Sequence, residues 1–226
     1  MNLNEALEIA VRTDPGLLRP HNEDAVFGDA AQGLAILADG MGGYNAGEVA
    51  SGMATTLLAG SLIGTLDERE PQQFDAAGVR VAHRQLRDRI DDANAEIYFA
   101  GQNQPKFAGM GTTLVVGWFY DNLLTVAHIG DSRLYRLRGN IFDRLTRDHS
   151  LLQEQLDSGI ISAEDARFSL NKNLVTRALG VDLAVDPEIR DFPVEPGDVY
   201  LLCSDGLTDM VSDLEIGLTL RDLRDN

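Results

Sequence analysis

Apolar residues recur at helical spacing over two stretches of the chain. Between Phe74 and Phe99 they follow one another at steps of three and four, which places them on one face of an α-helix. This face consists of Val79, Ala82, Leu86, Ile90, Ala93 and Ile97. A second apolar stripe contains Ala46, Val49, Ala50 and Met53. The spacing of Asn45 and Glu48 resembles a capping box, so this helix is predicted to begin near Asn45.

The apolar period changes to that of β-strands in the middle of the chain. Thr112–Phe119 and Leu123–Ile129 are rich in β-branched and apolar residues, and Tyr120-Asp121-Asn122 between them predicts a hairpin. Further strands are predicted at Leu7–Arg12, Gly33–Asp39, Arg133–Arg138 and Val199–Cys203, with a turn at Arg138-Gly139-Asn140. Because the strands arrive in blocks joined by hairpins, we expect antiparallel sheets covered by helices, an α+β fold.

The remaining segments contain short helices and loops. Helices are predicted over Ser150–Asp157, Ser162–Phe168 and Ser212–Leu223, and Ser212 with Glu215 forms a capping-box pattern at the last of these. Thr13–Glu23 is predicted to be a polar loop. No internal repeat or low-complexity linker divides the sequence, so residues 1–226 are interpreted as one domain.

The formal net charge of -17 excludes some classes of function. An acidic surface repels nucleic-acid backbones and anionic membranes, so neither is an expected partner. No apolar run is long enough to cross a bilayer, and Met1–Glu5 lacks the pattern of a secretory signal. The single Cys203 excludes an internal disulfide and fits a reducing cytoplasm. The excess of carboxylates indicates either a solvated surface or a cation site, and charge alone does not decide between them.

Two predicted strands end in the same way. Asp39-Gly40 and Asp205-Gly206 each place a carboxylate just after a buried apolar run, followed by glycine. A strand end holds the carboxylate rigidly, and the glycine lets the backbone approach an ion with its carbonyl free as a ligand. Hard cations such as Mg²⁺ and Mn²⁺ prefer oxygen ligands of this kind. Asp-Gly is also a common turn, so one such pair would be weak evidence.

Two further polar segments offer chemistry. Arg19 presents a planar guanidinium that suits phosphate oxygens, and Glu23 and Asp24 follow it closely. Asp131, in Ile129-Gly130-Asp131-Ser132-Arg133, is an acid at a tight corner between two predicted strands. Taken singly, the first segment also fits a solvated loop and the second an ordinary turn.

Together these segments resemble the metal-dependent, type 2C (PPM) family of serine/threonine protein phosphatases, in its bacterial form. The resemblance covers almost the whole chain and keeps the order of the family's motifs. These are RPHNED, LADGMGG, GMGTTLVV, IGDSRLY and LLCSDGLTD, and LTRDHS and NLVTRALG resemble the segments that flank the family's flap. Several motifs in the right order are far more specific than one.

The resemblance implies a four-layer αββα sandwich, in which two antiparallel sheets are flanked by helices. It implies that Asp39 bridges two central ions, Mn²⁺ or Mg²⁺, with the Gly40 carbonyl on one and Asp205 on the other. Glu23 and Asp24 would act near these metals, partly through waters. Asp131 with Asp205 would bind a weaker third ion. Arg19 would grip the substrate phosphate, and residues from about 150 to 173 would form the flap.

The reaction implied is hydrolysis of phosphoserine and phosphothreonine by a metal-activated water at a binuclear centre. We expect a monomeric cytoplasmic phosphatase that reverses a bacterial serine/threonine kinase. One alternative is a catalytically silent member of the fold, which the intact Arg19, Asp39, Asp131 and Asp205 disfavour. Another is a calcium-stabilised binding protein, which would need EF-hand-like loops that the sequence lacks. The absence of a Gly-x-x-x-x-Gly-Lys stretch excludes a P-loop enzyme.

The sequence departs from animal members of the family at Met41. Those members carry a histidine there, a candidate general acid, so leaving-group protonation would fall to a metal-bound water or another group. His149 is one candidate for that group, but a structural role, capping the helix that follows, is favoured for it, and His21 is predicted to be a loop residue. Cys203 lies in an apolar run and is predicted to be an inert core thiol.

The last triplet, Arg224-Asp225-Asn226, resembles a late metal-binding motif of the family. Asp225 lies 20 positions after Asp205, however, and the family's interval is longer. The Leu214, Leu218 and Leu223 pattern predicts that the triplet continues a helix. We therefore expect Asp225 to be no ligand and the closing strand to be missing, with a natural chain that is longer or was cut at this point.

Overall fold

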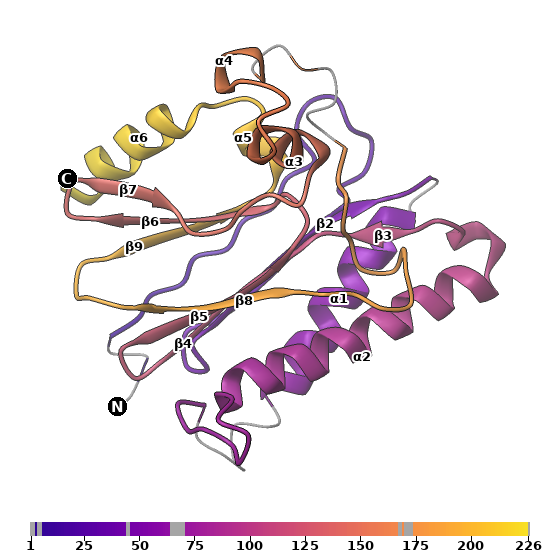
Figure 1. Cartoon of the computed structure of the whole chain (residues 1–226), viewed down its shortest axis with the longest axis horizontal. Helices are drawn as coiled ribbons and strands as arrows, with labels where there is room; N and C mark the ends of the chain where they lie inside the picture. The colour runs from indigo at the N-terminus through magenta and orange to yellow at the C-terminus, as the bar shows by residue number, and fades with distance from the viewer. Residues whose placement is uncertain are drawn as a thin grey trace.

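The computed structural model describes Leu3, residues 6–43, 46–63 and 71–166, Ser169 and residues 174–225. Its elements form four layers (Figure 1). Helices α1 (Ala46–Ile63) and α2 (Val81–Asn103) cover one sheet, a second sheet packs on the first, and α6 (Asp213–Asp225) covers the second sheet. The predicted αββα sandwich with two antiparallel sheets is confirmed. No described helix is both long and apolar enough to cross a membrane.

The first sheet has the strand order β1-β2-β4-β5-β8, and β3 pairs with β2 beside this path. All its pairs are antiparallel. A turn at Asp121-Asn122, with Asp121 at φ 48°, joins β4 to β5 as predicted. The strands are β1 (Asp24–Asp29), β2 (Leu34–Met41), β3 (Gly111–Thr112), β4 (Leu114–Tyr120), β5 (Leu123–Ile129) and β8 (Glu188–Pro193).

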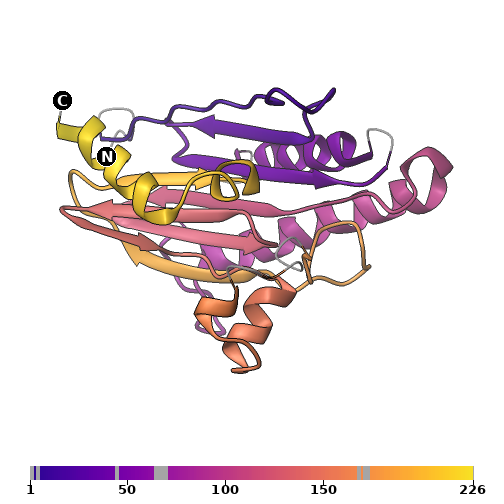
Figure 2. The same cartoon turned by 90° about the horizontal axis from the view of Figure 1, so that it is seen from above.

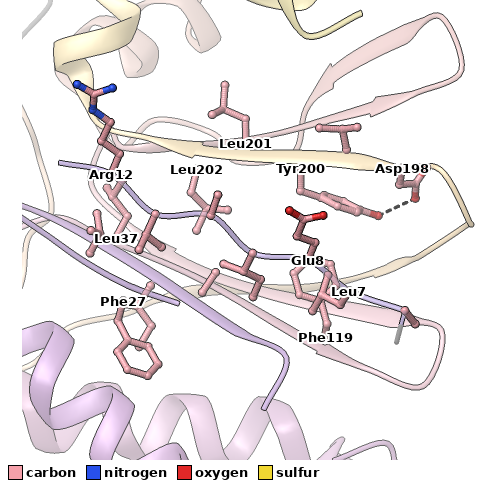
Figure 3. Close-up of a pocket in the computed structure, with 18 residues that line it drawn as sticks. Leu7, Glu8, Arg12, Phe27, Leu37, Phe119, Asp198, Tyr200, Leu201 and Leu202 are labelled. Atoms are coloured by element: carbon pink, nitrogen blue, oxygen red, sulfur yellow. Dashed lines mark hydrogen bonds between the residues drawn. The ribbon is translucent and has the colours of Figure 1, made fainter. Parts of the chain in front are cut away.

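The second sheet has the order β7-β6-β9 and contains β6 (Arg133–Arg138), β7 (Ile141–Arg144) and β9 (Val199–Cys203). Among the described residues, β9 has a strand partner on one side only. A cavity of about 550 Å³ lies beside it, lined by β9, by the extended residues 6–12 and by parts of β1 and β2. Figure 3 shows Leu7 and Leu202 among the largely apolar side chains around this cavity.

Two apolar cores hold the layers together. The larger lies between the first sheet and the two long helices, where Leu58, Leu86, Ile90 and Trp118 are almost fully buried. A smaller core lies between the sheets and contains Val115, Phe119, Leu124, Val126, Leu134 and Leu145. Each large side chain buried in this way contributes about 1.5–3 kcal/mol. The sandwich is therefore a rigid support for the residues at its strand ends.

The prediction of a strand at Leu7–Arg12 is wrong. The segment is extended, but no described backbone ladder joins it to a sheet. It packs by side chains instead: a Cβ placed on Gly28 of β1 would lie 2.7 Å from both Ile9 and Val11. The apolar side chains of Ile9 and Val11 therefore pack on β1, although the backbone of this segment does not pair with a described strand.

The second long helix begins at Val81, seven positions later than predicted, and ends at Asn103. Asp75 explains the delay. Its carboxylate accepts hydrogen bonds from the N–H groups of Ala77 and Val79, both at 2.9 Å, and so stabilises a turn. Gly78 completes that turn at φ 77°. Val79 lies outside the helix, whereas the other five residues of the predicted apolar face are buried.

Of the short helices among the described residues, two lie within the predicted ranges 150–157 and 162–168, and the other two, at 105–107 and 205–208, were not predicted. They are α3 (Leu151–Asp157), α4 (Ala163–Ala166), α5 (Asp205–Thr208) and the 3₁₀ turn η2 (Pro105–Phe107). In Figure 2, α3 and α4 (orange) project away from the two sheets. Ser212 and Glu215 form the predicted capping box: the Glu215 carboxylate accepts from Ser212, and the Ser212 hydroxyl from the Glu215 N–H. The predicted cap at Asn45, part of the flap and the Asp225 side chain lie outside what the structure describes.

Candidate active site

A cleft of about 410 Å³ lies at one end of the sandwich. It collects residues from the loop before β1, from the ends of β2 and β9, and from the corner between β5 and β6. Every site residue predicted from the sequence lines it: Arg19, Glu23, Asp24, Asp39, Gly40, Asp131 and Asp205. Segments that lie far apart in the sequence therefore meet at one place.

Strand pairing brings the first carboxylates together. Asp24 opens β1 directly opposite Asp39, near the end of β2. The Ser204 hydroxyl, at the end of β9, donates a hydrogen bond to Asp24 Oδ2 at 2.8 Å. This contact ties the strand end that carries Asp205 to the one that carries Asp24, although the two belong to different sheets.

Gly40 is required by close backbone packing. A Cβ at this position would lie 2.1 Å from the Gly47 carbonyl oxygen and 2.6 Å from that of Glu23. The Gly40 N–H donates to the same Glu23 carbonyl at 3.0 Å, and the Ser51 hydroxyl of α1 donates to it at 2.6 Å. Any side chain at position 40 would push the strand end away from α1 and from Glu23.

The gathered carboxylates disfavour each other's ionisation. Burial, followed by the charges of Asp24 and Asp205, raises the pKa of Asp39 far above its usual value. Burial and then Asp205 raise the pKa of Asp131 to about 6. The pKa of Asp205 is also raised, by burial first and then by Asp209. Such a group of acids is stable in its ionised form only with positive charge among them.

The protein supplies little of that positive charge. Arg19 is the only lysine or arginine among the described residues that line the cleft. Its side chain is 76% exposed, and its Nη1 lies 3.6 Å from Glu23 Oε2. An ion pair this long and exposed contributes little to stability. Arg19 can therefore turn toward an anion that enters the cleft.

The donor set fits hard divalent cations. The described lining offers six carboxylates together with backbone carbonyls, and no sulfur ligand apart from the thioether of Met41. Oxygen-only sites of this type suit Mg²⁺ and Mn²⁺. The close approach at Gly40 and the raised pKa values of Asp39 and Asp205 agree with a place built for cations.

Asp131 occupies the corner between β5 and β6. Gly130 before it adopts φ 98°, a left-handed conformation that favours glycine. The main chains of Gly130 and His149 are joined at this corner, because the His149 N–H donates to the Gly130 carbonyl at 2.9 Å. Asp131 is thereby held at the edge of the cleft.

His149 is structural, but it does not cap the next helix as predicted. The cap of α3 is Ser150, whose hydroxyl accepts from the Gln153 N–H at 3.3 Å. The His149 Nδ1 accepts instead from the Gly130 N–H at 3.2 Å. The sequence signal was ambiguous because a histidine beside a serine fits either arrangement.

His128, His149 and Glu188 bring three potential metal-ligating atoms within 4.8 Å of one another. Their hydrogen bonds and ring geometry indicate packing. The His128 Nε2–H donates to the Arg147 carbonyl at 2.8 Å, and the two rings stack at 4.8 Å with planes 18° apart. Rings this nearly parallel do not direct their nitrogens at one ion. The arrangement of these three side chains therefore fits packing better than metal binding.

The structure agrees with the predictions for the remaining residues that were expected to take no part in catalysis. Cys203 is buried, and burial raises the pKa of its thiol to about 12, so the reactive thiolate is disfavoured. His21 is an exposed loop residue at the edge of the cleft. Met41 lines the cleft, and a thioether has no proton to donate.

Residues 20–223 match the model of the family described as protein phosphatase 2C. The chain belongs to this family. As a member, it is a protein phosphatase of the metal-dependent serine/threonine class, and the resemblance seen in the sequence is confirmed. The match extends over both sheets, from the start of β1 almost to the end of α6.

Individual relatives agree with this assignment. The phosphatase is 40% identical to the "Serine/threonine phosphatase stp" of Listeria monocytogenes over 94% of its own length and 82% of that protein. It is 38% identical to "Protein phosphatase PhpP" of Streptococcus pneumoniae over 93% and 82%. A structure of the catalytic domain of the phosphatase PstP "in complex with 2 Manganese ions" superposes with a TM-score of 0.78 at 38% identity, covering 93% of this chain and 82% of that one.

Proposed function

We propose that this phosphatase hydrolyses phosphoserine and phosphothreonine in proteins at the carboxylate cleft. Asp39 would bridge two divalent cations, with Asp205 and the Gly40 carbonyl as further ligands and Glu23 and Asp24 beside them. The crowding of Asp24, Asp39 and Asp205 is the observation that carries this proposal. Without cations, these carboxylates disfavour one another's ionisation. When cations are bound, the same carboxylates form a strong set of metal ligands.

When bound, the cations supply a water of lowered pKa as nucleophile and neutralise charge on the phosphoryl oxygens. The side chains of the protein bind the phosphate and hold the metal ligands in place. The exposed Arg19 guanidinium binds the incoming phosphate and keeps phosphorus above the carboxylates. The strand ends that carry Asp39 and Asp205 keep their ligands fixed during the reaction, as electrostatic catalysis requires.

Asp131 would bind a third, weaker cation together with Asp205. Burial has the largest effect on the pKa of Asp131, and the charge of Asp205 has the next largest; both raise it. The two carboxylates therefore face a shared space. A second cleft of about 430 Å³ contains Asp131 and Asp205 as well and extends toward α3. An ion held there would lie between the central site and the flap.

Manganese or magnesium is the proposed metal, because the donor set is oxygen and a relative's structure contains manganese. We infer that the substrates are phosphoproteins, and that a bacterial serine/threonine kinase phosphorylates them. We further propose that the phosphatase acts as a monomer in the cytoplasm, where the reducing environment keeps its single cysteine reduced.

The test is hydrolysis of a phosphothreonine peptide and of an aryl phosphate, with Mn²⁺ and with chelator. We expect activity only with the metal. Asp205→Ala should abolish it, whereas Asp143→Ala, an exchange on β7 outside the cleft, should leave it intact. Undiminished hydrolysis in chelator would refute the proposal.

A further inference from the structure

Two threonine hydroxyls hold the backbone of Asp39. Asp39 of β2 lies opposite Thr113, between the pairs Leu37–Val115 and Gly40–Thr112. The Thr113 N–H donates to the Asp39 carbonyl at 2.9 Å, as in an ordinary ladder. The Asp39 N–H, however, donates to the Thr113 side-chain oxygen at 3.1 Å. The Thr112 hydroxyl donates to the Asp39 carbonyl at 2.9 Å.

The Thr113 hydroxyl also reaches the corner that carries Asp131. Its oxygen lies 2.7 Å from the hydroxyl oxygen of Ser132, and the two residues are 3% and 1% exposed. A hydroxyl has one donor and two acceptor lone pairs. Thr113 can therefore accept from the Asp39 N–H and still make a hydrogen bond with Ser132. Valine, which has the same shape, can do neither.

The corner fits tightly around this hydroxyl pair. A Cβ on Gly130 would lie 2.7 Å from the Thr113 Cβ and Cγ2 atoms, so the corner rests directly on the threonine. On the other side, His149 exchanges two hydrogen bonds with the Gly130 backbone. The corner can neither approach nor leave β2 without breaking one of these contacts.

We propose that Thr113 and Ser132 are positioning residues, which fix Asp39 relative to Asp131 and so join the central and accessory cation sites. This inference rests on the proposed function of the cleft. The path is short: Asp39 N–H to Thr113 Oγ1 to Ser132 Oγ, one residue from Asp131. Neither residue touches the substrate; each acts through the carboxylate that it places. Outer contacts of this kind typically change metal affinity by about 10–100-fold when they are lost.

Thr146 provides a matched control. It is a buried threonine, 3% exposed, whose hydroxyl accepts a backbone N–H, that of Leu134, at 3.0 Å. Thr146→Val and Thr113→Val therefore remove the same kind of hydrogen bond from the same kind of site. Only Thr113 has the Asp39 N–H as its partner and lines the cleft.

The experiment measures Mn²⁺ binding by calorimetry and thermal unfolding in chelator for the wild type and four variants. We expect Thr113→Val to weaken Mn²⁺ binding about tenfold and Ser132→Ala about threefold, with Thr113→Ser within about twofold of the wild type. Thr146→Val should lower the unfolding temperature without changing Mn²⁺ affinity.

Wild-type Mn²⁺ affinity in both Thr113→Val and Ser132→Ala would overturn the inference, and so would equal weakening in Thr146→Val. If Thr113→Val does not fold, Ser132→Ala against Thr146→Val decides the matter in the same way. Failure of the wild type itself to bind Mn²⁺ would instead refute the proposed function of the cleft.

Discussion

Replacing Asp39 with asparagine should stabilise the metal-free phosphatase. Asparagine keeps the shape of the side chain and removes the charge that burial, Asp24 and Asp205 disfavour. These effects raise the pKa of Asp39 from 3.8 to about 9. A raised pKa in the folded state means that stability is lost as pH rises from about 4 toward 9. The asparagine variant has no carboxyl group at this position and would show no such loss.

The size of the effect follows from the same numbers. Each pH unit between the ordinary pKa of Asp39 and the working pH lowers the free energy of unfolding by about 1.4 kcal/mol. The loss of stability at pH 7 is therefore at most about 4 kcal/mol. Entry of water among the carboxylates reduces this to about 2 kcal/mol. For a chain of this length, that corresponds to about 4–8 °C in the unfolding temperature.

The assay is thermal unfolding at pH 6, 7 and 8, in chelator and then in Mn²⁺. In chelator, Asp39→Asn should unfold at a higher temperature than the wild type, by a margin that grows with pH. In Mn²⁺ at about 100 times its dissociation constant, the wild type should gain about 2.7 kcal/mol and the variant little.

Asp198→Asn is a control for which the expected change in stability has the opposite sign. Burial would raise the pKa of Asp198, but hydrogen bonds from Arg138, the Glu195 N–H and the Tyr200 hydroxyl outweigh it and lower the pKa to about 2. Its loss should destabilise the protein at pH 7. A metal-free Asp39→Asn protein less stable than the wild type at every pH would refute the reasoning.

Three other exchanges test single residues. Arg19→Ala should raise KM and lower kcat/KM, by an amount equivalent to about 1.5–3 kcal/mol of transition-state binding. Arg19→Lys should restore only part of the lost kcat/KM, because lysine lacks the planar guanidinium. Unchanged kinetics in Arg19→Ala would show that Arg19 is a surface residue without a role in binding. Asp131→Ala should keep two Mn²⁺ ions, as counted by calorimetry, and lose phosphopeptide turnover; three ions in the variant would contradict its role. Asp225→Ala should change Mn²⁺-dependent activity less than about threefold, and a loss as deep as that of Asp205→Ala would make Asp225 a ligand.

The sequence predicted the strands and helices that bury one clear face. Leu86 and Ile90 repeat at helical spacing and are fully buried, and the hairpin after Tyr120 has strong turn residues. It did not predict β1, β7 and β8, in which every described residue is half-buried or exposed. Strands without a fully buried face give a weak periodic signal, and long-range pairing decides them.

The composition of the site could be predicted because strand ends with Asp-Gly and the loop from Arg19 are visible in the sequence. Their convergence could not be derived from periodicity, since it depends on pairing between β1 and β2 and on the contact of Ser204 with Asp24. The hydroxyl contacts of Thr113 and Ser132 left no local signal either. Threonine is common in strands, and only the register shows that Thr113 faces Asp39.

The most direct test of the whole account is anomalous scattering from crystals of the wild-type phosphatase grown with Mn²⁺. The account predicts two strong manganese peaks, both within ligand distance of the Asp39 carboxylate, one beside the Gly40 carbonyl and the other beside Asp205. The same crystals of Asp39→Asn should show neither peak at full strength. Manganese found only away from Asp39, for instance between His128 and Glu188, would contradict the claim that these aspartates form the catalytic centre.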